Sequence, residues 1–532
     1  MPRIRCSHSP RSCGRIETLE PQPTARRSSS MNPLPFLRAW RVLAVLVAAS
    51  CLCAAQLGCK KEPVPEVPAD PAANALQATP LRVLVLDDEP LATALERHWR
   101  ATAEQSIEVH RAAAADVLGP DQKKLDADAV IYPAGLIGEL AERQLIAALP
   151  DEALAGDKFD ARDILEMARL REVTWGEKVF AVPLGSPQLT LFYRADIFER
   201  LQLKPPTTWA EYQRLAELLT NRERLGDLAP PADQPWHGTA EPLGPGWAGQ
   251  MLLARAAAYA RHRSHYSTLF DFSSMAPLID GPPFVKALEE LVAAAKFGSP
   301  HATDWTPHDV RRELLAGRAA MAVTWPTRAI DSAKANDDAQ QSDESRPAFA
   351  IACAELPGAR EMFNFRENRW EQRGPQDDPH VPLLSVAGRL GSVTKESARA
   401  RSTLNLLVLL SGADWSVQVL NRSPDTTLFR QRHLAAPRAW IDESFGDEAA
   451  QQFAKVTQES HKHPAWLFSV RIPGRRDYLA ALDEATQQAI RGDSPPADSL
   501  HTTAARWREI TTRLGEASQR RAYRRSLGLE LD

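Results

Sequence analysis

The sequence predicts an α/β protein with at least two lobes. Short apolar, β-branched runs alternate with amphipathic segments in the first part of the body, which is the pattern of a parallel sheet covered by helices. The length of 532 residues exceeds what one hydrophobic core ordinarily supports. Hydrophobic residues make up 44% of the chain and charged residues 25%, which is ordinary for a soluble globular protein and argues against fibrous and multi-span membrane classes.

The N-terminus has the layout of a secretory signal. An uncharged apolar run at 42–58 follows Arg38 and Arg41 and ends in small residues before Cys59. This run is shorter than the ~20 residues that a membrane-spanning helix needs. The ending Leu57-Gly58-Cys59 resembles the bacterial lipoprotein box, which implies acylation of Cys59 and a protein anchored to a lipid membrane on the periplasmic or extracytoplasmic side.

Two boundaries in this region stay open. Met31 begins a segment of ordinary signal length, so we interpret residues 31–59 as the lipoprotein signal peptide and residues 1–30 as a candidate non-native extension of the start. Cys51 is a competing acylation site, and a plain cleaved signal or an uncleaved anchor is the alternative. Residues 60–80 are rich in Pro and Ala and predict an extended tether.

Charge and cysteine usage fit an exported acidic body. Residues 1–58 carry eight Arg and two Glu, a net charge of +6, whereas the whole chain carries −4, so the remainder carries −10. An acidic body argues against a nucleic-acid partner. Five of the six cysteines lie at or before Cys59, so the body keeps only Cys353, which we interpret as a small buried apolar residue.

The body is predicted to open with a strand, a helix, two further strands and a second helix. We expect strands at 82–86, 107–110 and 128–132, with helices at 89–102 and 137–149. In such sheets ligands meet the loops at the carboxyl ends of the strands, which here are residues 87–90 and 133–136.

The middle of the chain alternates short strands, polar turns and helices. Residues 179–182 and 189–193 predict strands on either side of a turn, and a helix follows at 196–203. Pro205-Pro206 interrupts the chain, after which Thr207 or Thr208 can cap a helix at 209–219. Residues 222–250 are rich in Pro and Gly and predict a loop.

The remaining elements follow the same reading of periodicity. We expect helices at 284–297 and 308–316, a strand at 319–324, a polar excursion at 331–346, a strand at 348–354, a hairpin at 361–372, a strand pair at 382–393 around Gly388, and mostly helices from Lys395 to the end.

Four segments, in order, resemble extracellular solute-binding protein family 1, which includes maltose-binding protein and many sugar-binding lipoproteins of ABC importers. They read DAVIYPAGLIGELAERQLIAALP at 128–150, VFAVPLGSPQLTLFYRADIFERLQLKPPTTWAEYQRLAELL at 179–219, DVRRELLAGRAAMAVTWP at 309–326 and VAGRLGSVTKESARARSTLNLLVLLSGADWS at 386–416. Together they span about 290 residues. Residues 222–250 and 331–346 resemble insertions relative to that pattern.

The resemblance implies a two-lobed periplasmic binding protein type II fold with a hinge between the lobes. Lobe 1 would comprise 81–188 and 382–440, and lobe 2 would comprise 189–381, with C-terminal helices at 441–532 packed across both. A sugar held in the cleft would close the lobes and be passed to the permease subunits of an importer. The resemblance implies a monomer without cofactor, metal or catalytic residues.

Sugars bind to aromatic platforms and to amide, carboxylate and hydroxyl partners. On that basis we expect ligand contacts from residues at strand ends, in the turn before the lobe crossing and in a Gly-rich loop, namely Asp87, Asp88, Tyr132, Pro133, Ser186, Gln188, Trp247, Trp325 and Gly388. The alternatives are helix capping for the two aspartates, core or rim packing for the tryptophans and a hinge role for Gly388.

The sequence contains no pattern that clearly indicates a cofactor loop or an enzyme active site. Residues 244–249 match G-x-G-x-x-G, but a Pro-rich loop precedes them, so we reject a cofactor loop. H-E-x-x-H, G-x-S-x-G and P-loop motifs are absent from the sequence, and the pairs His262/His265 and His461/His463 are interpreted as solvated. Two alternative functions remain: a sensor or scaffold lipoprotein, and a cleft glycoside hydrolase that uses Asp87 and Asp88.

Overall fold

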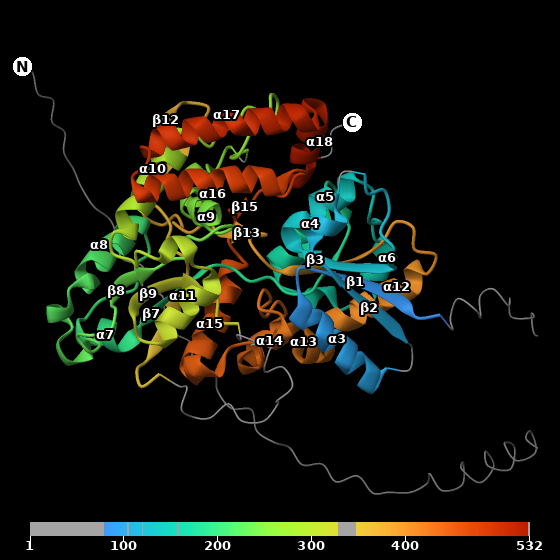
Figure 1. Ribbon diagram of the computed structural model, residues 1–532, viewed down its shortest axis with the longest axis horizontal. Coiled ribbons are helices and arrows are strands. Elements are labelled where there is room, and N and C mark those ends of the chain that lie inside the picture. The colour runs from blue at the N-terminus through green and yellow to red at the C-terminus, as the bar shows by residue number, and fades with distance from the viewer. Residues whose placement is uncertain are drawn as a thin grey trace, which may run out of the picture. The chain divides into compact units, whose positions relative to one another are not determined.

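Two main sheets with their own helices form the core of the described chain (Figure 1). The computed structural model describes residues 79–103, 106–119, 121–156, 159–265, 267–327 and 347–529. The predicted α/β class is confirmed. The signal peptide predicted at 31–59, with Cys59, lies outside the described residues, as do the tether up to residue 78 and the excursion at 331–346.

The first sheet has the strand order β2-β1-β3-β14-β6. Alternate residues of β1 enter two different hydrophobic clusters, with Val83 and Val85 on one face and Leu84 and Leu86 on the other. The sheet is therefore covered on both faces, as parallel sheets usually are. Its strands are β1 (Leu81–Leu86), β2 (Ile107–Ala112), β3 (Ala129–Pro133), β14 (Arg389–Val393) and β6 (Val182–Pro183); β1 to β3 are parallel and β14 is antiparallel to both neighbours.

Helices accompany this sheet from both ends of the sequence, and together they form what we call the first lobe. Helix α3 (Glu89–Thr102) has the predicted bounds, because the Asp88 carboxylate caps it and Leu91, Leu95 and Trp99 give it one buried face. The others are α4 (Ala114–Val117), η1 (Ala134–Leu136), α5 (Ile137–Glu142), α6 (Asp151–Leu154), η2 (Ala161–Asp163), the π-helix η3 (Ala168–Glu172), α12 (Ala400–Ser411), α13 (Ala413–Val419) and η9 (Leu420–Arg422).

The helix predicted at 137–149 is wrong in its second half. Helix α5 ends at Glu142, and Gln144 adopts a left-handed backbone with φ 55°. Beyond it the chain is extended, and Ile146 forms a bridge with Thr394. Leu145 and Ile146 are buried because of this pairing and not because they lie on a helical face. The spacing of apolar residues alone therefore wrongly predicted that the helix continues.

The second sheet has the order β10-β7-β9-β8, and with its helices it forms the second lobe. Thr208 and Glu211 form the capping box that starts α8. The strands are β10 (Ile351–Ala354), β7 (Thr190–Arg194), β9 (Ala319–Thr324) and β8 (His237–Ala240). The helices are α7 (Ala195–Arg200), α8 (Trp209–Thr220), η4 (Arg222–Arg224), η5 (Gly226–Leu228), α9 (Ala248–Ala260), α10 (Pro282–Ala295), η6 (Ala302–Asp304), α11 (Pro307–Leu315) and α15 (Gly446–Ser460).

Two of the predicted loops and pairs differ from the structure. Strand β8 lies inside the predicted loop at 222–250, and its sequence His-Gly-Thr-Ala has no apolar alternation that would reveal it. The segments at 382–393 do not pair with each other: β13 (Leu383–Leu384) pairs with β15 (Leu467–Phe468), whereas β14 joins the first sheet. The predicted hairpin is confirmed as β11 (Glu361–Asn364) and β12 (Arg369–Gln372), and β4 (Thr174–Trp175) and β5 (Lys178–Val179) form another.

The C-terminal helices contact elements of both lobes. Helix α16 (Arg475–Arg491) packs on α9, and α17 (Pro496–Leu514) packs on α16 and α10. Helix α18 (Glu516–Ser526) then contacts α5 and β4. Between the lobes the chain also forms α14 (Gln431–Ala435), η10 (Pro437–Ala439) and η11 (Glu443–Phe445).

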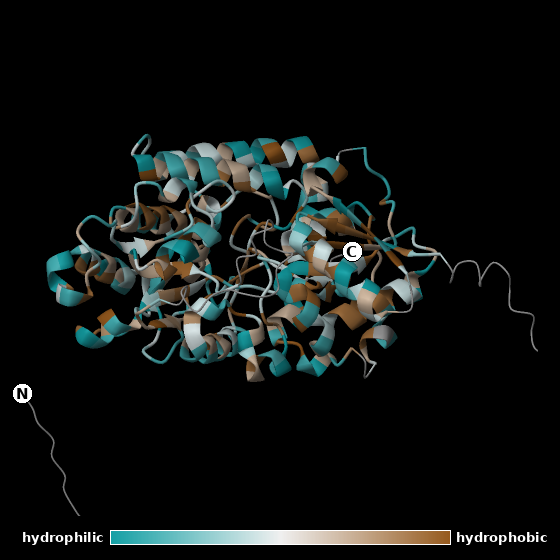
Figure 2. Ribbon diagram, turned by 60° about the horizontal axis from the view of Figure 1, so that its bottom comes forward, coloured by the Kyte–Doolittle hydropathy of each residue, from teal (hydrophilic) through white to brown (hydrophobic). Residues whose placement is uncertain are grey.

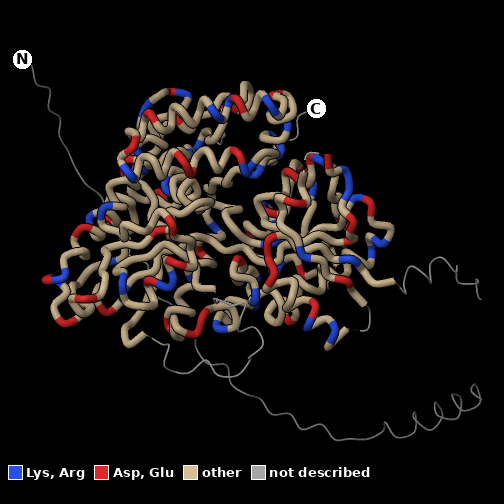
Figure 3. Tube along the Cα trace, in the orientation of Figure 1, with Lys and Arg blue, Asp and Glu red and all other residues tan. Residues whose placement is uncertain are grey.

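Hydropathy and charge are distributed as in an ordinary folded body. Hydrophobic segments gather on the strands, and hydrophilic segments lie on outer turns of helices (Figure 2). Acidic and basic segments are interspersed in the view of Figure 3. Within the described residues no single helix has the length and apolarity to cross a membrane, and the one pair that passes together, 400–411 with 413–422, is bent by 78°.

Two connections between the sheets run side by side and are tied by one carboxylate. Residues 184–189 lead from β6 to β7, and residues 385–388 lead into β14; we call these the chain crossings. Buried Glu172 accepts hydrogen bonds from the Ser186 hydroxyl in the first crossing and, at 3.1 Å, from the Ser385 amide in the second. Burial raises the pKa of Glu172, and these two hydrogen bonds and Arg471 oppose the rise.

Gly388 lets the two crossings approach. Its φ is +101°, and a Cβ there would lie 2.7 Å from the Gly185 carbonyl oxygen. Gly388→Ala should lower the free energy of unfolding by about 3 kcal/mol, combining backbone strain with overpacking. Gly492→Ala is the matched control, because Gly492 has φ +78° but open space around it, and it should cost only about 1 kcal/mol. Urea unfolding measures both, and equal losses would contradict the close packing of the crossings.

Asp128 supplies a pH-dependent contact at the start of β3. It accepts from the Arg82 amide at 3.0 Å and the Ser397 hydroxyl at 2.9 Å, and it pairs with Arg399. Burial opposes ionisation, but these partners prevail and lower the pKa of Asp128 below its ordinary 3.8. Because the folded-state pKa is depressed, the stabilisation is present above that ordinary value and is lost as the pH falls further.

Asp128→Asn should therefore lower the free energy of unfolding by about 2 kcal/mol at neutral pH, and the difference should fade in acid. Denaturant titrations across pH measure it. Asp126→Asn, at a position that is 87% exposed, should have no such effect. A loss for Asp128→Asn that does not change with pH would show that packing, not charge, is responsible.

Candidate functional site

The lobes touch where strand β9 ends. Buried Trp325 follows β9, and its indole N–H donates to the Pro424 carbonyl oxygen at 3.0 Å; the Thr327 hydroxyl donates to the same oxygen at 3.0 Å. The Pro424 loop belongs to the first lobe, because its neighbours Ser423 and Asp425 bond to side chains there. We call this contact region the lobe junction.

Trp247 adds a second aromatic ring at the lobe junction. It is half-buried, and its ring centroid lies 5.4 Å from that of Trp325 with the planes tilted by 55°. Its position is fixed by the start of α9, where Asp483 of α16 accepts from the Gly246 and Gly249 amides at 2.9 and 2.7 Å. The junction therefore has an apolar aromatic surface held by a rigid helix end.

The same contacts explain why residues 244–249 are no cofactor loop. A phosphate would need the free amides at the start of α9, but the Asp483 carboxylate already binds two of them. Burial raises the pKa of Asp483, and the hydrogen bonds from the two glycines and nearby Arg475 oppose the rise.

Charged groups from both lobes surround the junction. From the first lobe, the buried Arg389 guanidinium donates to Asp88 at 2.8 Å, to Asp425 at 3.0 Å and to the Asp87 carbonyl oxygen at 2.9 Å. The Asp425 side chain remains 28% exposed and so can accept further hydrogen bonds.

From the second lobe, α11 contributes His308 and Arg311, whose Nδ1 and Nη2 lie 2.9 Å apart. Burial and neighbouring Arg311 lower the pKa of His308 to about 4 despite the opposing charge of Asp425, so its imidazole is neutral near pH 7. Within the described residues, Nη1 of Arg311 has no hydrogen-bond partner. The junction therefore offers both donors and acceptors.

Three predicted site residues are engaged inside the first lobe. Asp88 is buried; one oxygen caps α3 by accepting from Leu91, and the other accepts from Arg389 and Ser423. Tyr132 is fully buried, with its hydroxyl 2.8 Å from that of Ser392, and burial raises its pKa strongly. Ser186 is committed to Glu172. Their polar atoms are hydrogen-bonded within the first lobe, so we propose that these three residues position the site, and the predicted solute contacts stay predictions.

The other predicted residues lie in different surroundings. Asp87 is exposed, has φ 53° and accepts from the Ala114 amide at 2.9 Å. Pro133 is half-buried at the end of β3, opposite Arg389. Gly388 lies in a chain crossing, and Gln188 lies in the other crossing beside a pocket. The structure thus brings Trp247 and Trp325 together, whereas Gln188 belongs to a separate place.

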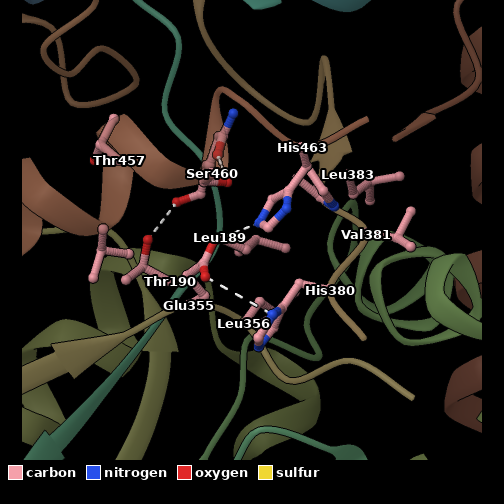
Figure 4. Close-up of a pocket in the computed structure, with 13 residues that line it drawn as sticks. Leu189, Thr190, Glu355, Leu356, His380, Val381, Leu383, Thr457, Ser460 and His463 are labelled. Atoms are coloured by element: carbon pink, nitrogen blue, oxygen red, sulfur yellow. Dashed lines mark hydrogen bonds and ion pairs between the residues drawn. The ribbon is translucent and has the colours of Figure 1, made fainter. Parts of the chain in front are cut away.

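That pocket lies beside the first crossing (Figure 4). Gln188 enters it and accepts from the Ser460 hydroxyl. Its lining comes from the first crossing, the end of β10, the segment around β13 and the end of α15, namely Gln188, Leu189, Thr190, Glu355, Leu356, His380, Val381, Pro382, Leu383, Val456, Thr457, Ser460 and His463.

The histidines here were misjudged from sequence. His461 is buried, and the His463 side chain is only 7% exposed, so the interpretation of this pair as solvated is wrong. Burial opposes the protonation of His463, but Asp378 and Glu355 prevail and raise its pKa to about 9. His262 is likewise buried and bonds Glu371 at 3.1 Å. The partners come from distant segments, so no local pattern could have revealed them.

The comparisons with known proteins agree on the class. The family model for bacterial extracellular solute-binding proteins matches residues 111–358. This stretch is a little under half of the chain, and the match supports the resemblance to this family that the sequence indicated. The search of curated proteins found no match to this chain.

Solved structures of solute-binding proteins share the fold at low sequence identity. An ABC transporter solute-binding protein from Agrobacterium radiobacter K84, in complex with ribitol, is 16% identical with a TM-score of 0.59, covering 82% of this chain and 99% of its own. Maltose-bound MalE3 of T. maritima is 16% identical, with a TM-score of 0.56, and the match covers 81% of this chain and 99% of MalE3. The sugar-binding protein MalE of Xanthomonas citri is 15% identical, with a TM-score of 0.57, and the match covers 82% of this chain and 98% of that protein. The two-lobed solute-binding fold is confirmed.

Asp88 provides a test of the positioning role in this solute-binding protein. Asp88→Asn leaves the buried Arg389 without its nearest charge, so we expect the free energy of unfolding to fall by about 3–5 kcal/mol. Asp477→Asn breaks the exposed pair with Arg513 and should cost less than about 1 kcal/mol. Denaturant unfolding compares the two variants. Wild-type stability in Asp88→Asn together with lost solute binding would instead make Asp88 a solute ligand.

Proposed function

We propose that this solute-binding protein captures a carbohydrate or polyol at the lobe junction and delivers it to the permease subunits of an ABC-type importer. The observation that carries the proposal is the Trp247–Trp325 pair, which stands where the second lobe meets the first. Tryptophan rings bind the C–H faces of sugar rings and polyol chains, while their N–H groups stay available for hydrogen bonds.

The polar groups of the junction supply the second requirement of a sugar site. Hydroxyl groups are both donors and acceptors, so they need carboxylates on one side and cationic or neutral N–H donors on the other. Asp425 is the accessible carboxylate, and Arg311 has a free buried donor within the described residues. A neutral His308 accepts from Arg311 at Nδ1, so its proton lies on Nε2, which adds a donor.

The ligands of the fold relatives favour the same chemical class. The structures that share the fold contain ribitol, maltose and D-mannitol. These molecules are uncharged and rich in hydroxyl groups, as the mixture of aromatic, carboxylate and N–H groups at the junction requires. The hydrolase alternative loses support, since one of its two carboxylates, Asp88, is held by Arg389.

Capture is coupled to transport through the crossings. A solute that binds the closed arrangement of the lobes more tightly shifts the population toward it, and the permease then recognises that arrangement. We propose that the protein acts as a monomer on the extracytoplasmic side, tethered by residues 60–80 to an acylated Cys59 in the membrane.

A thermal-shift screen of the full chain against sugars, polyols, amino acids and anions tests the proposed function. A solute that binds only the folded state raises the free energy of unfolding by mass action, by about 2.7 kcal/mol when its concentration is a hundred times Kd. The Tm rises as a result. A shift with a sugar or polyol that is recovered unchanged supports transport. A cleaved sugar would indicate an enzyme, and no shift with any compound would favour a sensor or scaffold.

Trp247→Ala should weaken binding of the solute found in that screen at least about tenfold, because loss of an aromatic platform costs more than about 1.4 kcal/mol. Trp415→Ala is the control, since Trp415 is also half-buried but packs on His98 and Trp99 of the first lobe. Titration calorimetry gives both affinities. Equal affinities in the two variants would place the solute away from the junction.

A further inference from the structure

The two imidazoles of His380 and His463 and the Glu355 carboxylate line the pocket together (Figure 4), and the Asp378 carboxylate bonds both imidazoles. Glu355 follows β10, Asp378 and His380 precede β13, and His463 follows α15. One ligand atom from each of Glu355, His380 and His463 lies within 4.8 Å of the others. Because the ligand atoms come from three separate segments, the folded chain and not a local turn brings them together.

The hydrogen bonds orient each ring toward a common point. His463 Nε2 lies 2.6 Å from Glu355 Oε1, and its Nδ1 lies 2.8 Å from Asp378 Oδ2. His380 Nδ1 lies 2.7 Å from Asp378 Oδ1 and 3.8 Å from Glu355 Oε2. Asp378 therefore supports His463 from the side of the ring opposite Glu355, whereas on His380 the same nitrogen, Nδ1, lies near both carboxylates.

This donor set is the one that zinc-like ions prefer. Imidazole nitrogen and carboxylate oxygen bind Zn²⁺ at about 2.0–2.2 Å, which puts tetrahedral ligand atoms about 3.3 Å apart. The separations of the two imidazole nitrogens from the Glu355 oxygens, 2.6 Å for His463 and 3.8 Å for His380, bracket that value, so small side-chain rotations suffice to bring the atoms into place. A carboxylate behind a ligating histidine, as Asp378 lies behind His463, is the usual second shell of such sites.

Burial and access also suit a metal ion. The side chains of His463, His380 and Glu355 are 7%, 17% and 22% exposed, so they are largely fixed in position yet reachable from solvent. All three line the pocket, whose other walls include Leu356, Val381 and Leu383. A tetrahedral ion held by three side chains would have its fourth position directed into this cavity.

We propose that Glu355, His380 and His463, with Asp378 supporting the His463 imidazole, form a binding site for one divalent transition-metal ion of the Zn²⁺ class. The site is separate from the lobe junction, and it stands independently of the solute that the junction binds. Because it joins the second sheet, the approach to the second crossing and the end of α15, a bound ion would fasten three segments that lie at the base of the lobes.

Titration calorimetry of the untagged full chain, stripped with a chelator and titrated with ZnCl₂ alone, tests the site. We expect one equivalent of Zn²⁺ to bind and the Tm to rise with Zn²⁺ concentration. Mg²⁺ should give no such binding, because it prefers oxygen ligands in octahedral geometry. Absence of Zn²⁺ binding to the wild-type chain would overturn the proposal.

Variants locate the ion. His463→Gln should weaken Zn²⁺ binding more than about 100-fold, and Asp378→Asn, which removes only the supporting carboxylate, about 10- to 100-fold. His501→Gln is the matched control, because the His501 side chain is 77% exposed and lies on α17; its affinity should equal that of the wild type.

His380→Gln is the second ligand variant, to be used if His463→Gln loses its circular-dichroism spectrum. Wild-type affinity in a folded ligand variant would show that Zn²⁺ binds elsewhere. The four side chains would then be a hydrogen-bonded ion-pair network and no metal site.

Discussion

The buried guanidinium of Arg389 is the contact on which the site geometry depends. It is the first residue of β14, and it binds the loop after β1 through Asp88 and the Asp87 carbonyl oxygen. It also binds Asp425, next to the carbonyl that accepts from Trp325. A guanidinium suits this task because its five donors have fixed directions and its charge persists when it is buried. One side chain thus sets the helix cap, the sheet edge and the lobe junction.

The arrangement separates residues that position from residues that remain free to bind. Asp88, Tyr132 and Ser186 have their polar atoms committed within the first lobe, and their burial makes the framework stiff. Trp247 and Asp425, by contrast, keep part of their surface accessible at the junction. Glu172 ties the two chain crossings together, and we propose that the lobes hinge there.

Most of the fold was predictable because its signals are local. Helix α3 was predicted from the capping residue Asp88 and the apolar face that follows it, and β9 was predicted from the apolar run Ala319–Thr324. Strand β8 was missed, since its four residues are recognisable as a strand only through pairing with β9. Helix α5 was predicted too long, because Leu145 and Ile146 are buried by sheet pairing and not by a helix.

The site was only partly predictable for the same reason. Trp325 was predicted from its place at a strand end and Trp247 from its Gly-rich loop, but neither segment shows that the two rings contact each other in the second lobe. Asp88 was placed at the correct strand end, but its engagement by a residue 301 positions later decides its role. Asp378 and Glu355 beside His463 had no local signal at all.

The most direct test of the account is the distance between the lobes with and without solute. Spin labels on exposed positions of α3 in the first lobe and α8 in the second, measured by pulsed electron paramagnetic resonance, report that distance. If a sugar binds at the junction and closes the lobes, its addition should shorten and narrow the distance distribution in the wild type but not in Trp247→Ala. A sugar that binds tightly while leaving the distribution unchanged would contradict capture by closure.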